Sequence, residues 1–240
     1  MTEFLFMKDA EANYVKEFEA IVVKAGENYV VLDRTAFYAV GGGQETDTGA
    51  LSWDGGMARV KEVTKKGEVR HVLDGPVPPP DTKVRGTVDW ERRHAHMRMH
   101  TAQHIISSVV FDIYKARTVG NQIHADRSRV DFAPANFGPE DVKKIEDACN
   151  EIGSKGIPVK IYEEDRADLE KRVDQQRSNL DLLPQSIRRL RIVDIDGFDV
   201  CPCAGTHVRS TTELGKFHII EREKKGKDRE RLTYELVITP

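Results

Sequence analysis

Short apolar runs alternate with turn residues over the first third of the chain, which is the pattern of a small β domain. The apolar runs cover residues 18–23, 29–32, 50–53, 58–63 and 83–89, with Gly, Asn and Asp between several of them. A further strand is expected after Lys66-Gly67, and three consecutive prolines at 78–80 form a stiff connector before the last run. Many short strands at close spacing are typical of a small barrel.

From Asp89 onward the pattern changes to a mixture of helices and strands. Apolar residues at helical spacing predict a first helix over residues 94–115. Helices are also expected at 139–153, where Pro139 suits an early helical position, and at 165–177. Strands are expected at 128–133, 159–163, 190–195, 216–222 and 231–238. The fold class predicted is therefore α+β, with a β-barrel-like N-terminal domain at residues 1–88 and an α+β domain at 89–240.

Composition narrows the class of protein only moderately. The 240 residues carry a net charge of −3, so the overall charge does not indicate nucleic-acid binding. Local clusters of Arg and Lys nevertheless permit RNA binding. Three cysteines form no disulfide framework, which fits a reducing compartment. With neither a secretory signal nor an apolar stretch of membrane-spanning length, the chain is predicted to be soluble and cytoplasmic, with no membrane partner.

Two short elements about a hundred residues apart offer metal ligands. His100 and His104 lie four residues apart within the first predicted helix, so their side chains share one helical face. Cys203 and His207 repeat that spacing in a segment that Pro202 and nearby glycine mark as a loop after a strand. Three imidazoles and one thiol suit a single zinc ion.

Spacing alone leaves alternatives for both pairs. His96 also lies four residues before His100, so these two form a rival pair on the helix. Cys201 competes with Cys203, although only Cys203 lies four residues before His207. A single pair of histidines at this spacing is more often a surface or core feature than a metal site, and the second pair is what favours a site here.

With these elements placed, the chain resembles the editing domain of alanyl-tRNA synthetase and its free-standing relatives, the AlaX proteins. Three stretches carry the resemblance. The first is Thr35-Ala36-Phe37-Tyr38 with Gly41-Gly42-Gly43-Gln44 and Asp47-Thr48-Gly49, similar to the family's glycine-rich element. The second is Val88-Asp89-Trp90-Glu91-Arg92-Arg93 followed by the histidine pair, and the third is Cys203-Ala204-Gly205-Thr206-His207-Val208, with Ala204 where glycine is usual.

The resemblance implies a specific activity and a specific site. It implies that His100, His104, Cys203 and His207 are the ligands of one zinc ion, and that His96 and Cys201 are not. It also implies a medium-length, free-standing trans-editing hydrolase with tRNA(Ala) as its partner. Such an enzyme deacylates misacylated tRNA(Ala), chiefly Ser-tRNA(Ala), with Gly-tRNA(Ala) as a further substrate.

Substrate-binding residues are expected in two places. The family puts polar residues that recognise the substrate after the first metal helix, where Thr118 is the first candidate and Gln122 the second. The glycine-rich residues Gly41, Gly42 and Gly43, with Gln44, offer close backbone approach to the tRNA end or to the editing core. Both segments have a structural alternative, as ordinary turn residues.

Two other functions fit the same metal elements. One is a zinc-stabilised tRNA-binding module without catalysis, and the other is a metallohydrolase of a small ester. Four protein ligands usually mark a structural zinc site, because catalytic sites keep a position open. Whether zinc activates a water or only positions the substrate is left open by the sequence.

Overall fold

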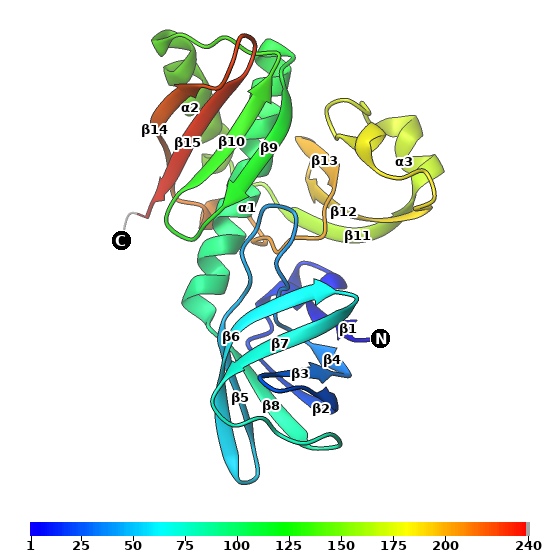
Figure 1. Ribbon diagram of the computed structural model, residues 1–240. Coiled ribbons are helices and arrows are strands. Elements are labelled where there is room, and N and C mark those ends of the chain that lie inside the picture. The colour runs from blue at the N-terminus through cyan, green and yellow to red at the C-terminus, as the bar shows by residue number, and fades with distance from the viewer. Residues whose placement is uncertain (239–240) are drawn as a thin grey trace. The chain divides into compact units, whose positions relative to one another are not determined.

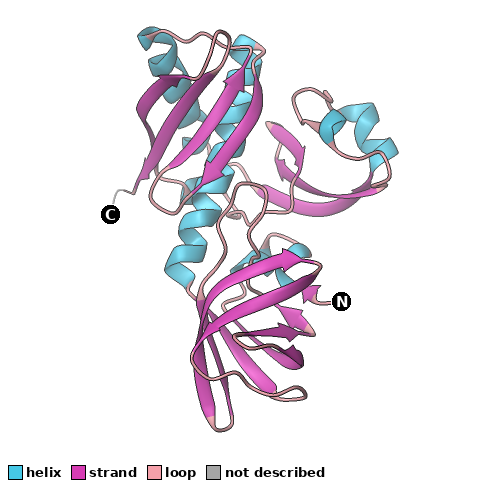
Figure 2. Cartoon of the chain, in the orientation of Figure 1, coloured by secondary structure: helices cyan, strands magenta, loops and turns pink. Residues whose placement is uncertain are grey.

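The computed structural model describes residues 1–238, which divide into two compact units, Met1–Ala95 and a second that begins at His96. Helix α1 (Trp90–Tyr114) passes through the boundary between them. Figures 1 and 2 show a first unit built mainly of strands and a second that mixes helices and strands. The predicted fold class, α+β with an N-terminal barrel, is confirmed.

A closed antiparallel barrel forms the first unit. Its six strands follow each other in the order β2-β3-β7-β6-β5-β8, and β8 closes the barrel onto β2 (Figure 1). The strands are β2 (Glu17–Ala25), β3 (Tyr29–Leu32), β5 (Gly49–Trp53), β6 (Gly56–Lys66), β7 (Glu68–Asp74) and β8 (Lys83–Val88). Register shifts in β2 and β6 mark bulges, which help a sheet to curve and close.

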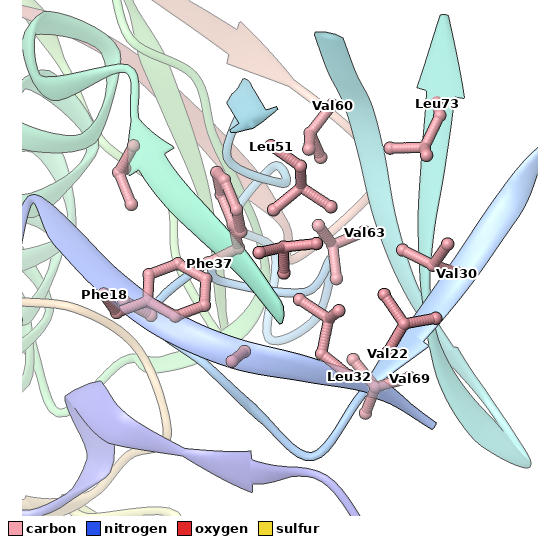
Figure 3. Close-up of a cluster of buried hydrophobic side chains, with 14 of the residues drawn as sticks. Phe18, Val22, Val30, Leu32, Phe37, Leu51, Val60, Val63, Val69 and Leu73 are labelled. Carbon is pink, nitrogen blue, oxygen red and sulfur yellow. The ribbon is translucent and has the colours of Figure 1, made fainter. Parts of the chain in front are cut away.

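The barrel interior is a hydrophobic core that follows from strand alternation. Along β2, Phe18, Ala20 and Val22 are buried while the residues between them are exposed. Figure 3 shows Phe18 and Val22 in the same cluster as Phe37 and Leu51 and as valines of neighbouring strands. Burying such side chains contributes roughly 1.5–3 kcal/mol each to folding.

The remaining elements of the first unit are short. Strands β1 (Glu3–Phe4) and β4 (Arg34–Thr35) pair in parallel, and two 3-10 helices cover Leu5–Met7 and Glu11–Tyr14.

A buried ion pair lies where α1 begins. Arg93 and Asp47 are both fully buried, and Nε of Arg93 donates to Oδ2 of Asp47 at 2.9 Å. Nη1 of Arg93 donates to the carbonyl of Asn13 at 3.0 Å, and the backbone N–H of Tyr38 donates to Asp47 at 2.6 Å. These bonds fix the start of α1 and the loop before β5 to one another.

The second unit contains a four-stranded sheet with helices on one face. The strands, in spatial order, are β14 (Lys216–Lys224), β15 (Glu230–Val237), β10 (Ser128–Ala133) and β9 (Arg117–Ile123). Helices α1 and α2 (Pro139–Ser154) lie along the same face of this sheet (Figure 1). The hydroxyl of Tyr234 in β15 donates to the carbonyl of Met99 in α1 at 2.8 Å, which ties the sheet to the helix.

A second, three-stranded antiparallel sheet completes this unit. It consists of β11 (Val159–Asp165), β12 (Arg189–Ile195) and β13 (Asp199–Pro202). Helix α3 (Arg166–Arg172) packs against it through a small apolar cluster that includes Leu169, Leu190 and Ile192. Short 3-10 helices cover Leu180–Leu182 and Thr211–Glu213.

Most predicted elements appear with small shifts at their ends, but one helix is shorter than predicted, and the strands β1, β4, β9 and β13 were not predicted. The helix predicted at 165–177 ends at Arg172, because the side chain of Arg166 bonds the carbonyls of Leu180 and Pro184 and holds the following residues in a turn. Strand β9 was not predicted; residues 117–123 pair with β10 instead of forming a turn. Among the helices described within residues 1–238, none has the length and apolar character that crossing a membrane requires.

Candidate metal centre

Four side chains from two distant parts of the chain meet in the second unit. His100 and His104 project from one face of α1, while Cys203 and His207 follow the end of β13. One potential ligand atom from each of the four lies within 4.8 Å of the others. The three histidines are buried and Cys203 is partly buried, so the cluster could hold a metal ion away from bulk solvent.

The sulfur of Cys203 faces the ring nitrogens of the histidines. Its Sγ lies 3.4 Å from Nε2 of His207 and 3.5 Å from Nε2 of His100. The ring centroids of His100 and His207 are 4.4 Å apart, and those of His104 and His207 are 4.9 Å apart. The donor atoms therefore converge on one small volume, as the ligands of a single ion must.

Two further residues orient the histidines. Nδ1 of His104 lies 3.0 Å from Oδ2 of Asp199, and Nδ1 of His207 lies 3.1 Å from Oγ1 of Thr101. With Nδ1 of each ring directed at an oxygen, Nε2 is the nitrogen left to face the cluster. The backbone N–H of Val208 also donates to Oγ1 of Thr101 at 3.3 Å, which links the two ligand segments.

A glycine makes the close approach of the two segments possible. A Cβ atom built on Gly205 would lie 2.1 Å from Cε1 and 2.3 Å from Nδ1 of the His100 ring. No side chain fits at such distances. The backbone N–H of Gly205 also donates to Sγ of Cys203 at 3.3 Å, a bond that favours the thiolate.

The four residues set one another's ionisation. Burial opposes the thiolate of Cys203, but the imidazoles of His100 and His207 outweigh it and hold the pKa of Cys203 well below its ordinary value. Burial also holds the pKa of His207 well below its ordinary value. At His104 burial is outweighed by hydrogen bonds to Asp199 and Cys203, which raise its pKa to about 10. A metal needs a thiolate and neutral imidazoles, so the lowered pKa values of Cys203 and His207 favour the ligand forms of these two residues, whereas His104 would have to lose a proton on binding.

The rival ligands suggested by spacing lie outside this cluster. His96 is buried in α1, but neither of its ring nitrogens belongs to the group of converging atoms. Cys201 donates its thiol to the carbonyl of Ser178 at 3.3 Å. Among the described residues, the structure thus brings together the four that the resemblance implies.

A polar network containing Thr118 borders the metal centre along α1. The hydroxyl of Thr118 donates to Oγ of Ser107 at 2.7 Å, and Nε2 of Gln103 donates to the same oxygen at 2.8 Å. Nδ2 of Asn121 donates to Oε1 of Gln103 at 3.4 Å. Gln103 and Ser107 flank His104 in the helix, so the network runs beside the stripe that carries the histidine ligands.

Gln122 lies on the face of strand β9 opposite to that of Thr118 and Asn121. It is exposed, and its Oε1 accepts a hydrogen bond from Nε of Arg129 at 3.0 Å. The register shift between Asp131 and Phe132 of β10 places Thr118 and Asn121 on one face of β9 and Gln122 on the opposite one.

The glycine-rich residues form a tight turn in the first unit. Gly41 and Gln44 pair through two backbone hydrogen bonds of 3.2 and 3.0 Å, and the intervening Gly42 and Gly43 have φ of 58° and 84°. Positive φ at both central residues is the geometry of a type I′ turn, which favours glycine. The hydroxyl of Tyr38 donates to the carbonyl of Gly41 at 2.8 Å, and the side chain of Gln44 is buried.

Several residues of the site were not found from the sequence. No role is predicted from the sequence for Asp199, Thr101, Gln103 or Ser107, although the last three are polar residues within the mostly apolar middle of α1. That signal could have found Thr101 and Gln103, because both are buried and a buried polar side chain in a core helix needs a partner. Asp199 gives no comparable signal, since its role depends on where β13 lies.

The comparisons with known proteins give the class first. Residues 2–92 match the family model described as tRNA synthetases class II (A). Residues 190–233 match the one described as threonyl and alanyl tRNA synthetase second additional domain. The chain is also 38% identical to an alanine–tRNA ligase of Pyrobaculum calidifontis over 94% of its own length but only 26% of that protein. These matches define a chain similar to the editing part of alanyl-tRNA synthetase.

The relatives matched over their whole length give the particular family. The chain is 38% identical to the alanyl-tRNA editing protein AlaX-M of Methanosarcina barkeri, covering 99% of this chain and 100% of that protein. It is also 38% identical to the protein of the same name from Saccharolobus solfataricus, covering 98% of each. The chain belongs to the AlaX-M family of alanyl-tRNA editing proteins, which confirms the resemblance seen in its sequence.

Proposed function

We propose that this chain is a zinc-dependent aminoacyl-tRNA deacylase that removes serine, and as a second substrate glycine, from misacylated tRNA(Ala). Membership of the AlaX-M family supports the reaction class and the partner. The single observation that carries the proposal is the convergence of His100, His104, Cys203 and His207 within 4.8 Å. The division expected from the sequence, residues 1–88 and 89–240, is kept here, with the editing site in the second part.

The donor set supports zinc as the ion. Three imidazole nitrogens and one thiolate match the borderline-soft ligands that zinc prefers, whereas magnesium and calcium prefer oxygen ligands. The orientation of Nε2 in His104 and His207 by Asp199 and Thr101 is the outer support that zinc histidines usually have. When bound, zinc would supply a Lewis acid beside the ester.

The polar network supplies a basis for choosing serine over alanine. Thr118, Ser107 and Gln103 present hydroxyl and amide groups that can exchange a mutual hydrogen bond for one to the serine hydroxyl. Alanine has no hydroxyl and cannot make this bond, so it would lack the roughly 0.5–1.5 kcal/mol that a typical hydrogen bond contributes. Thr118 is the residue we assign to recognition of the hydroxyl. Gln122, bonded to Arg129, and the turn from Gly41 to Gln44 are weaker candidates for substrate contact.

Parallel deacylation assays test the proposal. Purified zinc-loaded protein is given Ser-tRNA(Ala), Gly-tRNA(Ala) and Ala-tRNA(Ala), and loss of each amino acid is followed. Serine and glycine should be released while alanine is retained, and Cys203→Ala or His104→Ala should abolish release. Thr118→Val should slow serine release while Gln122→Ala leaves it near wild type. Full activity of a folded, metal-free variant would refute zinc dependence.

A second candidate function follows from the number of ligands. A site with four protein ligands is closed in the way that structural zinc sites are, which favours a zinc-stabilised tRNA-binding module without catalysis. The same assay separates the two functions, because such a module binds tRNA(Ala) yet releases no amino acid. A third activity, hydrolysis of a small ester, would appear as turnover of a serine ester in the absence of RNA.

A further inference from the structure

Asp199 is a buried carboxylate at the edge of the metal centre. It begins strand β13, and its side chain is 4% exposed. Oδ2 lies 3.0 Å from Nδ1 of His104, and Oδ1 accepts a hydrogen bond from Oγ of Ser108 at 2.6 Å. Both carboxylate oxygens are therefore held by groups of α1, and the carboxylate cannot rotate without breaking a bond.

The hydrogen bonds of Asp199 fix the orientation of one proposed ligand. A proton on Nδ1 of His104 that points to Asp199 leaves the lone pair of Nε2 directed at Cys203 and the other histidines. His207 receives the same kind of support from Thr101, whose hydroxyl is neutral. His104 and His207 thus each direct Nδ1 at an oxygen about 3 Å away, but one oxygen belongs to a carboxylate and the other to a neutral hydroxyl. Substituting the two partners therefore compares a charged with a neutral support of a proposed ligand.

Charge balance gives Asp199 a second role. A divalent cation held by three neutral imidazoles and the thiolate of Cys203 would retain one positive charge in a buried site. Burying an uncompensated charge is strongly unfavourable. Oδ2 of Asp199 lies within hydrogen-bond distance of Nδ1 of His104, and so places a negative charge directly behind a proposed ligand of the cation. The thiolate and this carboxylate together make the occupied site neutral.

We propose that Asp199 is a positioning residue of the metal site, which orients His104 and supplies the second negative charge that the buried cation requires. This inference rests on the metal site of the proposed function. Ser108 supports it by holding the second carboxylate oxygen.

Zinc affinity tests the inference without reference to activity. The dissociation constant for Zn²⁺ is measured by competition with a chromophoric chelator for the wild type, Asp199→Asn, Ser108→Ala and Thr101→Val. Asparagine keeps the shape and the acceptor oxygen but removes the charge. Asp199→Asn should raise the dissociation constant by about 10–100-fold, and Ser108→Ala and Thr101→Val by less. Asp194→Asn is the matched control, because Asp194 lies on the neighbouring strand β12 and bonds Tyr162 instead of a proposed ligand.

Co²⁺ spectra separate loss of charge from loss of structure. Co²⁺ bound to Asp199→Asn should keep the tetrahedral ligand-field bands and the thiolate band of the wild type, with affinity reduced in parallel with that for zinc. Wild-type affinity in Asp199→Asn overturns the inference and leaves the proposed function intact. If Asp199→Asn fails to fold, Ser108→Ala decides, and unchanged affinity there overturns the inference. A wild-type protein that binds neither ion overturns the proposed metal site as well.

Discussion

Replacing Gly205 by alanine should break the metal centre through a single steric contact. The added Cβ would lie 2.1 Å from Cε1 of His100, whereas ordinary contact begins at 3.4 Å. The ring or the loop must therefore move by about 1.3 Å, the difference between these two distances. Metal–ligand distances tolerate changes of about 0.2 Å, so His100 cannot give way by this amount and still coordinate the ion.

The expected effect of Gly205→Ala is larger than that of any outer-shell change. Loss of one ligand should weaken zinc binding by more than the roughly 10–100-fold that altered outer-shell partners cost. The metal-free protein should also lose about 1–3 kcal/mol of stability, the usual cost of forcing an extra methyl group into a packed site. Chelator competition measures the first quantity and urea unfolding of the metal-free protein measures the second.

A neighbouring substitution controls for nonspecific effects on the loop. Ala204 is exposed, so Ala204→Ser adds one atom to the same loop without a clash and should bind zinc as the wild type does. If Gly205→Ala binds zinc with wild-type affinity, then His100 is not held against this loop as the structure describes, and the steric argument fails.

Two further predictions concern the barrel unit. His71 lies with Nε2 2.8 Å from Oγ1 of Thr35, and burial lowers its pKa from 6.5 to about 4. Folding favours its neutral form, so its contribution is complete above pH 6.5 and is lost as the pH falls toward 4. Urea titrations should show about 2 kcal/mol of this loss between pH 7 and pH 5, absent in His71→Gln, and equal pH slopes for the two proteins would contradict it. Arg93→Met leaves the buried carboxylate of Asp47 without its cation and should lower the free energy of unfolding by about 3–5 kcal/mol in the same assay. Adding Asp47→Asn to this variant should recover part of the lost stability. A loss as small as that of a surface substitution would contradict the prediction.

Elements with strong local signals were predictable, and several elements fixed by distant contacts, such as β9 and the end of α3, were not. The alternation in β2 and the helical spacing in α1 are properties of consecutive residues, so the barrel and the long helix follow from the sequence. Strand β9 contains glycine and several polar residues and is held by pairing with β10, which no local pattern encodes. The predicted C-terminal end of α3 is wrong because the side chain of Arg166 donates hydrogen bonds to the carbonyls of Leu180 and Pro184. These bonds hold the chain after Arg172 in a turn and override the helix propensity of the residues there.

The same distinction applies within the candidate site. Spacing fixes the distance inside each ligand pair, but the meeting of the two pairs depends on the register of β12 and β13. The backbone N–H of Cys203 donates to the carbonyl of Arg191 at 3.0 Å, and Nη1 of Arg191 donates to the carbonyl of Cys203 at 2.7 Å, so the strand pairing extends to the proposed ligand. Cys201 is paired with Val193, two residues further along β12. A shift of one residue would turn Cys203 to the other face, and only a shift of two would put Cys201 in its place. The register therefore distinguishes two cysteines that spacing in the sequence leaves as alternatives.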